Sequence, residues 1–251
     1  MAISDEIKRE KQKTKDMDLK GKLSYFWDYY KIHTIVAAVA LFLIITMIRD
    51  IAAAKDYAFY GVYFNALQTF SAEEQMSAFS EYLELDTENY EAMLDSTMYY
   101  SFTDLSETSL AASQKFFAMI QTGDIDVTIA DEEIFTNYAV NEIFFDLREV
   151  LPKDLLEKYK DDIFYIDGAQ IAARNADDYW ESEDGQDYHR DSEKASTDHH
   201  DPSLLEDPIP VGIYVGGTPV ISKAGCYTEL VPVFGIVKNT SRADTAVKYG
   251  F

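Results

Sequence analysis

Residues 32–48 read IHTIVAAVALFLIITMI, an uncharged run rich in Ile, Val, Ala and Leu. Arg49 and Asp50 interrupt it before residues 51–54 extend the apolar character. Because a helix rises about 1.5 Å per residue, residues 32–54 can span a hydrocarbon core of roughly 30 Å. Amphipathic rings crowd one edge of the run, as they do at a membrane interface: Tyr25, Phe26, Trp27, Tyr29, Tyr30 and His33. The sequence therefore predicts a transmembrane helix over residues 32–54, and the competing interpretation is a buried core helix.

The charges on either side of this run predict its orientation. Residues 1–31 form a charged leader with eight Lys/Arg and six Asp/Glu, whereas Arg49 and Lys55 are the basic residues between the run and residue 58. An excess of Lys/Arg marks the cytoplasmic side of a span. We therefore predict a single-pass protein of the cell membrane, held in the lipid bilayer with a cytoplasmic N-terminus and with residues 57–251 extracytoplasmic. The alternative is a signal peptide cleaved near residues 52–54, although the leader before the apolar run is far longer than usual for one.

The composition is that of an acidic globular domain. The formal net charge is −23, and hydrophobic residues make up 47% of the chain, which is enough for a packed core. A chain this acidic is repelled by phosphate backbones, so we expect no nucleic-acid partner. Cys226 is the single cysteine, which excludes an intramolecular disulfide and a cysteine-based zinc site. A nearly cysteine-free exported domain is typical of a bacterium that does not use disulfides.

The region from residue 57 to residue 166 alternates between strand and helix patterns. Residues 57–64 (YAFYGVYF) are aromatic and β-branched, which predicts a strand buried on both faces. Ser71-Ala72-Glu73-Glu74 has the form of a capping box, and Gly123 follows an apolar helical face in the usual C-terminal position. Further strands are expected at residues 96–102, 125–130 and 163–166, and helices after residues 71, 104, 131 and 152. This alternation predicts an α/β sheet with helices packed against it.

Residues 208–251 return to β character after an acidic interruption. IPVGIYV (209–215), TPVIS (218–222) and VPVFGIVKN (231–239) each have a strand pattern. Gly216-Gly217 is a strong turn signal between the first two of these segments. Residues 243–249 are expected to begin a final helix.

Residues 175–207 are the acidic interruption, with twelve Asp/Glu against Arg190 and Lys194. This composition predicts a mobile surface excursion that is dispensable to the fold. Three histidines lie in it beside aspartates, and imidazole with carboxylate is a donor set for zinc, nickel or copper: His189, His199 and His200. Their spacing matches no compact motif, and closing a loop on a metal costs conformational entropy. We therefore favour a solvated loop with no metal and no cofactor.

The sequence offers little support for catalysis. The chain contains no GxSxG, HExxH, Walker or GxGxxG pattern. Asp124 with Asp126, and the residues 131–133, are candidates for paired-carboxylate catalysis. Capping of a helix start explains residues 131–133 without any chemistry. We therefore expect no enzyme activity.

Several short sequence segments in the middle of the chain resemble those of a known family. Residues 118–127 read AMIQTGDIDV, and Ala130-Asp131, Phe135, Tyr138-Ala139 and FFDL (144–147) follow. These phrases resemble the extracytoplasmic solute-binding proteins of ABC importers, which have the two-lobed type II periplasmic-binding-protein fold. Residues 233–248 are similar to the end of that family's sequences. The resemblance implies a periplasmic-binding-protein-like α/β domain that is reduced, because residues 57–251 are too few for two complete lobes, and the transmembrane helix departs from the family pattern.

The fold analogy also implies where a ligand binds. Ligands of open α/β sheets lie outside the carboxyl ends of strands, which here predicts ligand-binding residues at Phe64, Asn65, Tyr99, Tyr100 and Asp131. The competing interpretation gives each of them an ordinary core or capping role. The predicted function is a membrane-anchored extracytoplasmic binding module for a small-molecule solute. The alternative is a structural or interaction protein that is accessory to a membrane protein complex. An aromatic-lined cleft between two lobes favours the first, and a filled cleft or an exposed apolar patch favours the second.

Overall fold

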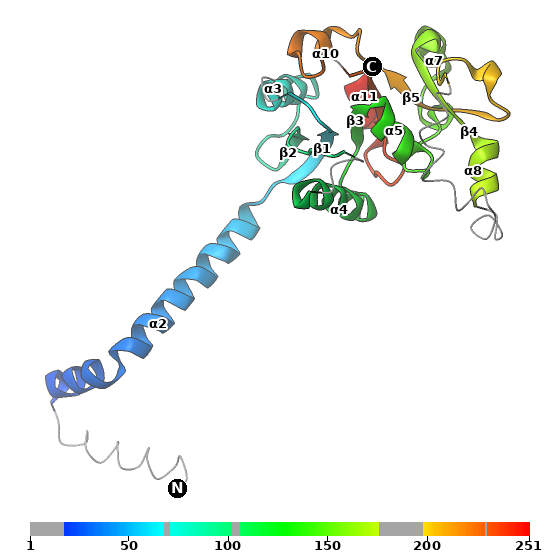
Figure 1. The fold of residues 1–251 in the computed structure, drawn as a ribbon. Coiled ribbons are helices and arrows are strands. Elements are labelled where there is room, and N and C mark those ends of the chain that lie inside the picture. Colours follow the sequence, from blue (N-terminus) through cyan, green and yellow to red (C-terminus); the bar gives the residue numbers. More distant parts are fainter. Residues whose placement is uncertain (1–17, 68–70, 102–105, 176–197, 229) are drawn as a thin grey trace. The chain divides into compact units, whose positions relative to one another are not determined.

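The computed structural model describes residues 18–67, 71–101, 106–175, 198–228 and 230–251. The chain divides into two compact units, Met1–Ala54 and Lys55–Phe251. The second unit holds the sheet and its flanking helices, which are traced in Figure 1.

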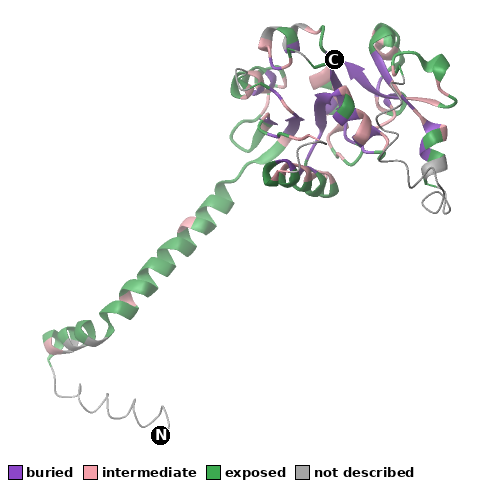
Figure 2. Ribbon diagram, in the orientation of Figure 1, coloured by how far each residue is buried: buried purple, intermediate pink, exposed green. Residues whose placement is uncertain are grey.

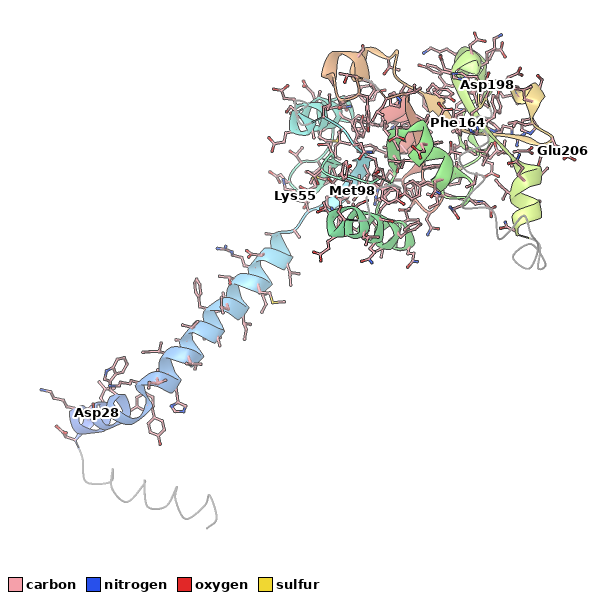
Figure 3. The ribbon with its side chains drawn as sticks, viewed as in Figure 1. Asp28, Lys55, Met98, Phe164, Asp198 and Glu206 are labelled. Atoms are coloured by element: carbon pink, nitrogen blue, oxygen red, sulfur yellow. The ribbon has the colours of Figure 1, made fainter. Side chains whose placement is uncertain are left out.

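The first unit contains one long helix, α2 (Leu19–Ala53). The carboxylate of Asp18 caps it by accepting a hydrogen bond from the Gly21 N–H at 2.8 Å. Within α2, Tyr30–Ala53 is long and apolar enough to cross a membrane, and none of its most apolar window is buried. The described side chains of α2 point outward around the helix, and nearly all of them are exposed (Figures 2 and 3).

This finding confirms an apolar N-terminal helix, and the helix extends upstream of the predicted span. The helix begins at Leu19 rather than at residue 32, so the aromatic edge is helical as well. The exposure of this window favours the predicted span over the competing interpretation, a buried core helix. Anchoring in a bilayer, orientation and the absence of cleavage stay predictions. Residues 1–17 of the predicted leader lie outside the described residues.

The described residues of the second unit form one six-stranded sheet with the order β2-β1-β3-β6-β5-β4. Its strands are β1 (Asp56–Tyr63), β2 (Tyr90–Asp95), β3 (Val127–Asp131), β4 (Ile163–Asp167), β5 (Pro208–Tyr214) and β6 (Pro232–Ile236). The strand β1 is parallel to β2 and β3, whereas β6 runs antiparallel to β3 and β5, and β4 runs antiparallel to β5. The sheet is therefore mixed, and the predicted α/β class is confirmed.

Helices cover both faces of this sheet, because alternate residues of β1 feed two different cores. Tyr60, Val62 and Phe64 belong to a cluster with residues of α4 (Glu107–Thr122), α5 (Glu132–Ala139) and α8 (Gly168–Arg174). Phe59 and Tyr63 belong to a second cluster on the opposite face. That cluster includes residues of α3 (Ala72–Tyr82), α6 (Leu147–Val150), α10 (Pro219–Ala224) and α11 (Ala243–Gly250). The remaining helical segments are α7 (Lys153–Lys158), η1 (Lys160–Asp162) and η3 (Pro202–Leu204).

Several element ends follow from local sequence, as expected. The Ser71 hydroxyl accepts from the Glu74 N–H at 3.3 Å, which starts α3. Gly123 ends α4 in the left-handed region with φ +73°. The Asp131 carboxylate accepts from the Ile134 N–H at 3.1 Å, which starts α5. These contacts confirm the three predicted helix boundaries.

The strand predicted at residues 96–102 is wrong. The strand β2 lies earlier, at Tyr90–Asp95, and residues 96–101 have no regular structure. The chain turns away from the sheet because the Asp95 carboxylate accepts hydrogen bonds from both the N–H and the hydroxyl of Thr97, at 2.9 and 2.7 Å. Of the aromatic residues described in this segment, Tyr100 packs against the core beside the sheet, whereas Tyr99 is exposed.

The strand predicted at TPVIS (218–222) is also wrong, because these residues begin α10. The Thr218 hydroxyl faces the Ile221 N–H at 3.5 Å, and Pro219 occupies the first helical turn. Gly225 ends the helix with φ +61°. Gly216-Gly217 does form a turn, but it leads from β5 into a helix instead of a hairpin.

Candidate functional site

Three of the five predicted ligand-binding residues meet at the carboxyl ends of β1 and β3. The Asn65 amide donates to the Tyr100 carbonyl at 2.9 Å, and its oxygen accepts from the Tyr100 N–H at 3.0 Å. The same amide nitrogen lies 3.5 Å from Oδ2 of Asp131. Asn65 also adopts a left-handed backbone with φ +56°, which Asn tolerates better than most residues. These contacts hold three chain segments together at this end of the sheet.

Phe64 and Tyr99, the other two predicted residues, have contrasting surroundings. Phe64 is fully buried, with its ring centroid 4.8 Å from that of Phe116 and 5.6 Å from that of Tyr138. Its carbonyl accepts a hydrogen bond from the Tyr227 hydroxyl at 2.7 Å. Tyr99, in contrast, is 47% exposed. Phe64, Asn65, Tyr100 and Asp131 thus lie at one end of the sheet, and their part in ligand binding stays a prediction.

The two described histidines of the acidic excursion, His199 and His200, each stack on an aromatic ring. The His199 ring stacks on Phe164 with centroids 4.4 Å apart, and its Nδ1 lies 2.7 Å from the Tyr165 carbonyl oxygen. The His200 ring stacks on Tyr214 at 3.8 Å. Among the described residues, no group of three or more His, Cys, Asp or Glu could hold a metal ion. His189 lies outside the described part of the chain.

The same contacts correct the predicted extent of the excursion. Residues 176–197 lie outside the described residues, but residues 198–207 are described and pack beside β4. The Tyr165 N–H donates to the His199 carbonyl at 2.9 Å, which places this segment along the outer edge of β4. Residues 198–207 therefore belong to the fold, because aromatic stacking and edge pairing hold them to it.

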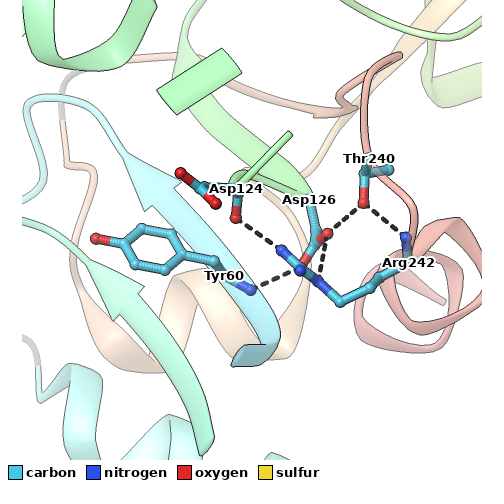
Figure 4. A network of polar contacts seen from close by, with 5 residues as sticks. All are labelled: Tyr60, Asp124, Asp126, Thr240 and Arg242. Carbon is cyan, nitrogen blue, oxygen red and sulfur yellow. Dashed lines mark hydrogen bonds and ion pairs between the residues drawn. The ribbon is translucent and has the colours of Figure 1, made fainter. Parts of the chain in front are cut away.

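Asp126, one of the candidate catalytic carboxylates, sits in a buried polar network (Figure 4). Its side chain is fully buried and accepts from the Tyr60 N–H at 2.7 Å, from Thr240 and from the Arg242 Nε at 2.9 Å. Burial raises the pKa of Asp126, while the hydrogen bonds from Thr240 and Arg242 act in the opposite direction. Because its lone pairs are occupied by the fold, the geometry gives this carboxylate a structural role.

A cavity of about 350 Å³ lies at the carboxyl end of β5, and we call it the β5 cavity. It is lined by Tyr159, Asp162, Ile213, Tyr214, Val215, Gly217, Thr218, Phe234, Gly250 and Phe251. Its volume falls in the range of small-molecule sites, about 300–1,000 Å³. It contains none of the five predicted ligand-binding residues, so the sequence reasoning missed it. The available signal was Gly217-Thr218, a turn directly after a buried strand.

Aromatic rings and a few polar groups converge on the β5 cavity. The Phe251 ring centroid lies 5.2 Å from that of Tyr159 and 5.8 Å from that of Phe234. Tyr214 also lines the cavity, but its ring belongs to the core cluster on the opposite face of the sheet, where its hydroxyl donates to Glu132 at 3.1 Å. The Asp162 carboxylate is exposed and has no ion-pair partner among the described residues. The cavity thus offers an apolar wall with acceptor groups at its rim.

Comparison with known proteins gives distant likenesses of fold. No protein-family model matches the chain, and no curated protein matches it. The chain is similar to an ABC substrate-binding protein from Listeria monocytogenes in complex with cycloalternan, with a TM-score of 0.32 and 12% identity over 78% of this chain and 74% of that one. It is also similar to the substrate-binding domain assigned to a molybdenum ABC transporter from Clostridium difficile, with a TM-score of 0.28 and 10% identity over 77% of this chain and 90% of that one. The likeness is to a solute-binding fold at most, and we take no ligand or partner from it.

Proposed function

We propose that this chain is a non-catalytic, solute-binding-like module held at the cell membrane by α2, with residues 55–251 outside the cell and a small molecule bound in the β5 cavity. The single observation that carries this proposal is the cavity itself, because open α/β sheets bind ligands in crevices at the carboxyl ends of strands. The ligand lays an apolar face on the rings of Tyr159, Phe234 and Phe251. A hydrogen-bond donor on the ligand reaches the Asp162 carboxylate.

A thermal-shift screen of the full chain in detergent micelles tests this proposal. The screen uses sugars, peptides, amino acids and metal salts. A ligand present at about 100 times its Kd stabilises the folded state by about 2.7 kcal/mol, which raises the melting temperature measurably. We expect one class in the screen to raise the melting temperature of the natural chain. The absence of any shift would contradict ligand capture.

Two matched variants locate the bound ligand. Asp162→Asn removes the carboxylate at the rim of the cavity, whereas Asp161→Asn changes the neighbouring exposed carboxylate outside it. We expect the first variant to lose most of the ligand-induced shift and the second to keep it. If Asp162→Asn kept the full shift while Tyr99→Ala lost it, the ligand would sit at the originally predicted residues instead.

One observation favours the alternative function, an interaction protein. The described residues from Lys55 onward form one unit around one sheet, so no second sheet in them closes over the β5 cavity. An open cavity binds a small molecule less tightly than a closed one, because less of the ligand surface is buried. A protein partner that protects the cavity residues from hydrogen exchange, with no small molecule active in the screen, would favour this alternative.

A further inference from the structure

A second cavity runs along the outer edge of β2, and we call it the β2 groove. Its volume is about 630 Å³. Every residue of β2, from Tyr90 to Asp95, lines it, together with one face of α3 and the side chains of Tyr60 and Lys115. The strand β2 is the edge strand of the sheet on this side, beside α3 (Figure 1). The groove is therefore floored by an edge strand and walled by a helix.

The two edge strands of the sheet, β4 and β2, differ in what covers their outer side. At the β4 edge, the His199 carbonyl accepts from the Tyr165 N–H at 2.9 Å, and residues 198–200 cover the strand. At the β2 edge, β1 is the sole described strand that pairs with β2. The sequence of β2, YEAMLD, contains neither Lys nor Pro, the residues that commonly block edge pairing. Apart from the Tyr90 N–H, which donates to the Asp86 carbonyl at 2.9 Å, the outward backbone groups of β2 can pair with an added strand.

The walls of the groove leave room for a second strand. On the α3 side, small residues line it: Ala72, Ser77 and Ser80. Tyr90 and Met93 are 43% and 42% exposed and supply apolar surface along the strand. A strand added beside a helix gains main-chain hydrogen bonds from the edge and side-chain contacts from the groove. An extended polypeptide segment matches this shape better than a compact small molecule does.

The charges in the groove indicate the kind of segment that fits. One of its two lysines is neutralised, because Lys115 Nζ lies 2.7 Å from Asp95 Oδ2, whereas Lys55 keeps its charge while it donates to the Thr87 carbonyl at 2.5 Å. Glu73 and Glu91 line the same groove and have no ion-pair partner among the described residues. The unneutralised charge of the groove is therefore negative, and it complements Lys or Arg.

We propose that the β2 groove binds an extended basic segment of a partner polypeptide, which adds to the sheet as a strand beside β2. The basic side chains of the segment pair with Glu73 and Glu91, and its backbone pairs with the outer edge of β2. This inference is independent of the β5 cavity, since the two cavities share no lining residue. Loss of one site leaves the other intact, so their tests are distinguishable.

Synthetic peptides test the proposal on the full chain in detergent micelles. The probe is a fluorescein-labelled peptide of six residues, the length of β2, in which Lys and Val alternate. One control replaces each Lys with Glu, and a second carries N-methyl groups on alternate backbone nitrogens. Fluorescence anisotropy at low salt measures binding. We expect the N-methyl control to bind at least about tenfold more weakly, because it loses main-chain hydrogen bonds. Equal binding of the two Lys peptides would overturn strand addition.

Variants of the chain complete the test. Glu73→Lys combined with Glu91→Lys reverses the charge of the groove, and Glu81→Lys changes an exposed carboxylate of α3 that does not line it. We expect the double variant to bind the Lys peptide about tenfold or more weakly than the natural chain does. We expect the affinity of the single control variant for this peptide to fall by about twofold or less. Binding that is unchanged in the double variant overturns the proposal. So does a dimer, detected by light scattering, that Glu91→Lys abolishes, because a second copy would then be the natural occupant.

Discussion

Arg242 binds the carboxylate of Asp126 through its Nε, at 2.9 Å from Oδ2 and 3.0 Å from Oδ1, although the two residues are 116 positions apart. Its Nη2 also donates to the Asp124 carbonyl at 2.7 Å. Asp126 in turn accepts from the Tyr60 N–H, so the pair ties the start of α11 to β1 and to the segment that leads into β3. The strands β1 and β3 are thereby locked to the last helix.

Removal of Arg242 is expected to destabilise the second unit strongly. Arg242→Ala leaves a fully buried carboxylate without its counterion, and breaking such a pair costs about 3–5 kcal/mol. The loss should lie near the lower end of this range, because the Arg242 side chain is 23% exposed. Guanidinium unfolding followed by near-ultraviolet circular dichroism measures it. The control is Arg148→Ala, which breaks an exposed pair with Asp146 and should cost about 1 kcal/mol or less.

The pH dependence of the Arg242→Ala variant provides a second check. Burial already raises the pKa of Asp126, and loss of Arg242 removes a contact that lowers it. A raised folded-state pKa means that stability is present at low pH and lost as the pH rises through that value. The deficit of the variant should therefore shrink as the pH falls from about 7 to about 5. A deficit that grows on acidification would contradict this account.

Asp95 is expected to stabilise the fold at neutral pH and to lose that effect in acid. Burial opposes its charged form, but the hydrogen bonds from Lys115 and Thr97 outweigh burial and lower the pKa of Asp95. A lowered pKa contributes stability above the unfolded value of about 3.9, which disappears as the pH falls through the folded value. Asp95→Asn should cost about 1 kcal/mol at neutral pH, because Lys115 is half exposed. Urea midpoints of both proteins should converge in strong acid, and a constant gap would refute the assignment.

Two glycines on neighbouring strands make room for one phenylalanine ring. A Cβ at Gly235 would lie 2.7 Å from the Phe135 ring and 2.9 Å from that of Phe144, and one at Gly212 would lie 2.7 Å from Phe135. Gly235→Ala should therefore destabilise the fold by about 1–3 kcal/mol through overpacking. The control is Gly217→Ala, where nothing lies within 4 Å of the added Cβ. Thermal unfolding should separate the two variants, and equal melting temperatures would count against this packing.

Asn65 is expected to contribute to stability through both its backbone and its amide. Asn65→Ala and Asn65→Gly both lose the two hydrogen bonds to Tyr100, but glycine accepts the left-handed φ at no steric cost. The alanine variant should therefore be less stable than the glycine variant by about 1–2 kcal/mol. Chemical unfolding measures the difference. Asn65→Asp should place a second carboxylate beside Asp131 and be more stable in mild acid than at neutral pH.

The predicted topology has a direct test in cells. Protease added to intact cells or spheroplasts should digest residues 55–251 and leave the segment before α2 protected, because the Lys/Arg excess before the apolar run predicts a cytoplasmic N-terminus. Antibodies to tags at the two ends follow the fragments. The control is the same treatment after detergent lysis, which should expose both ends. Digestion of the N-terminal tag alone would reverse the orientation, and a mature chain beginning near residue 55 would indicate a cleaved signal peptide.

Local sequence was sufficient wherever neighbouring residues determine the conformation. Short patterns predicted the apolar run of α2, the strand β1 buried on both faces, and the caps at Ser71, Gly123 and Asp131. Each depends on periodicity or on a hydrogen bond that spans about three residues. The α/β class followed from the order of these elements. Phe64, Asn65 and Asp131 were also predicted at one end of the sheet, because the parallel strands β1 and β3 end together, whereas Tyr100 lies there through its two hydrogen bonds to the Asn65 side chain and not as part of a strand.

Only the tertiary structure decided which of two competing sequence patterns forms the secondary structure. It also decided which parts of the surface form cavities. Residues 96–101 have strand-like composition, but Asp95 and Asn65 bind their backbone, so the half-exposed β2 takes the place at the edge. The segment from Thr218 forms a helix since its cap and Pro219 favour one where the sheet has no strand position for it. The partners of Asp126 and the linings of both cavities come from residues far apart along the chain. Such contacts depend on packing between distant segments, which the hydrophobic periodicity of a short segment does not encode.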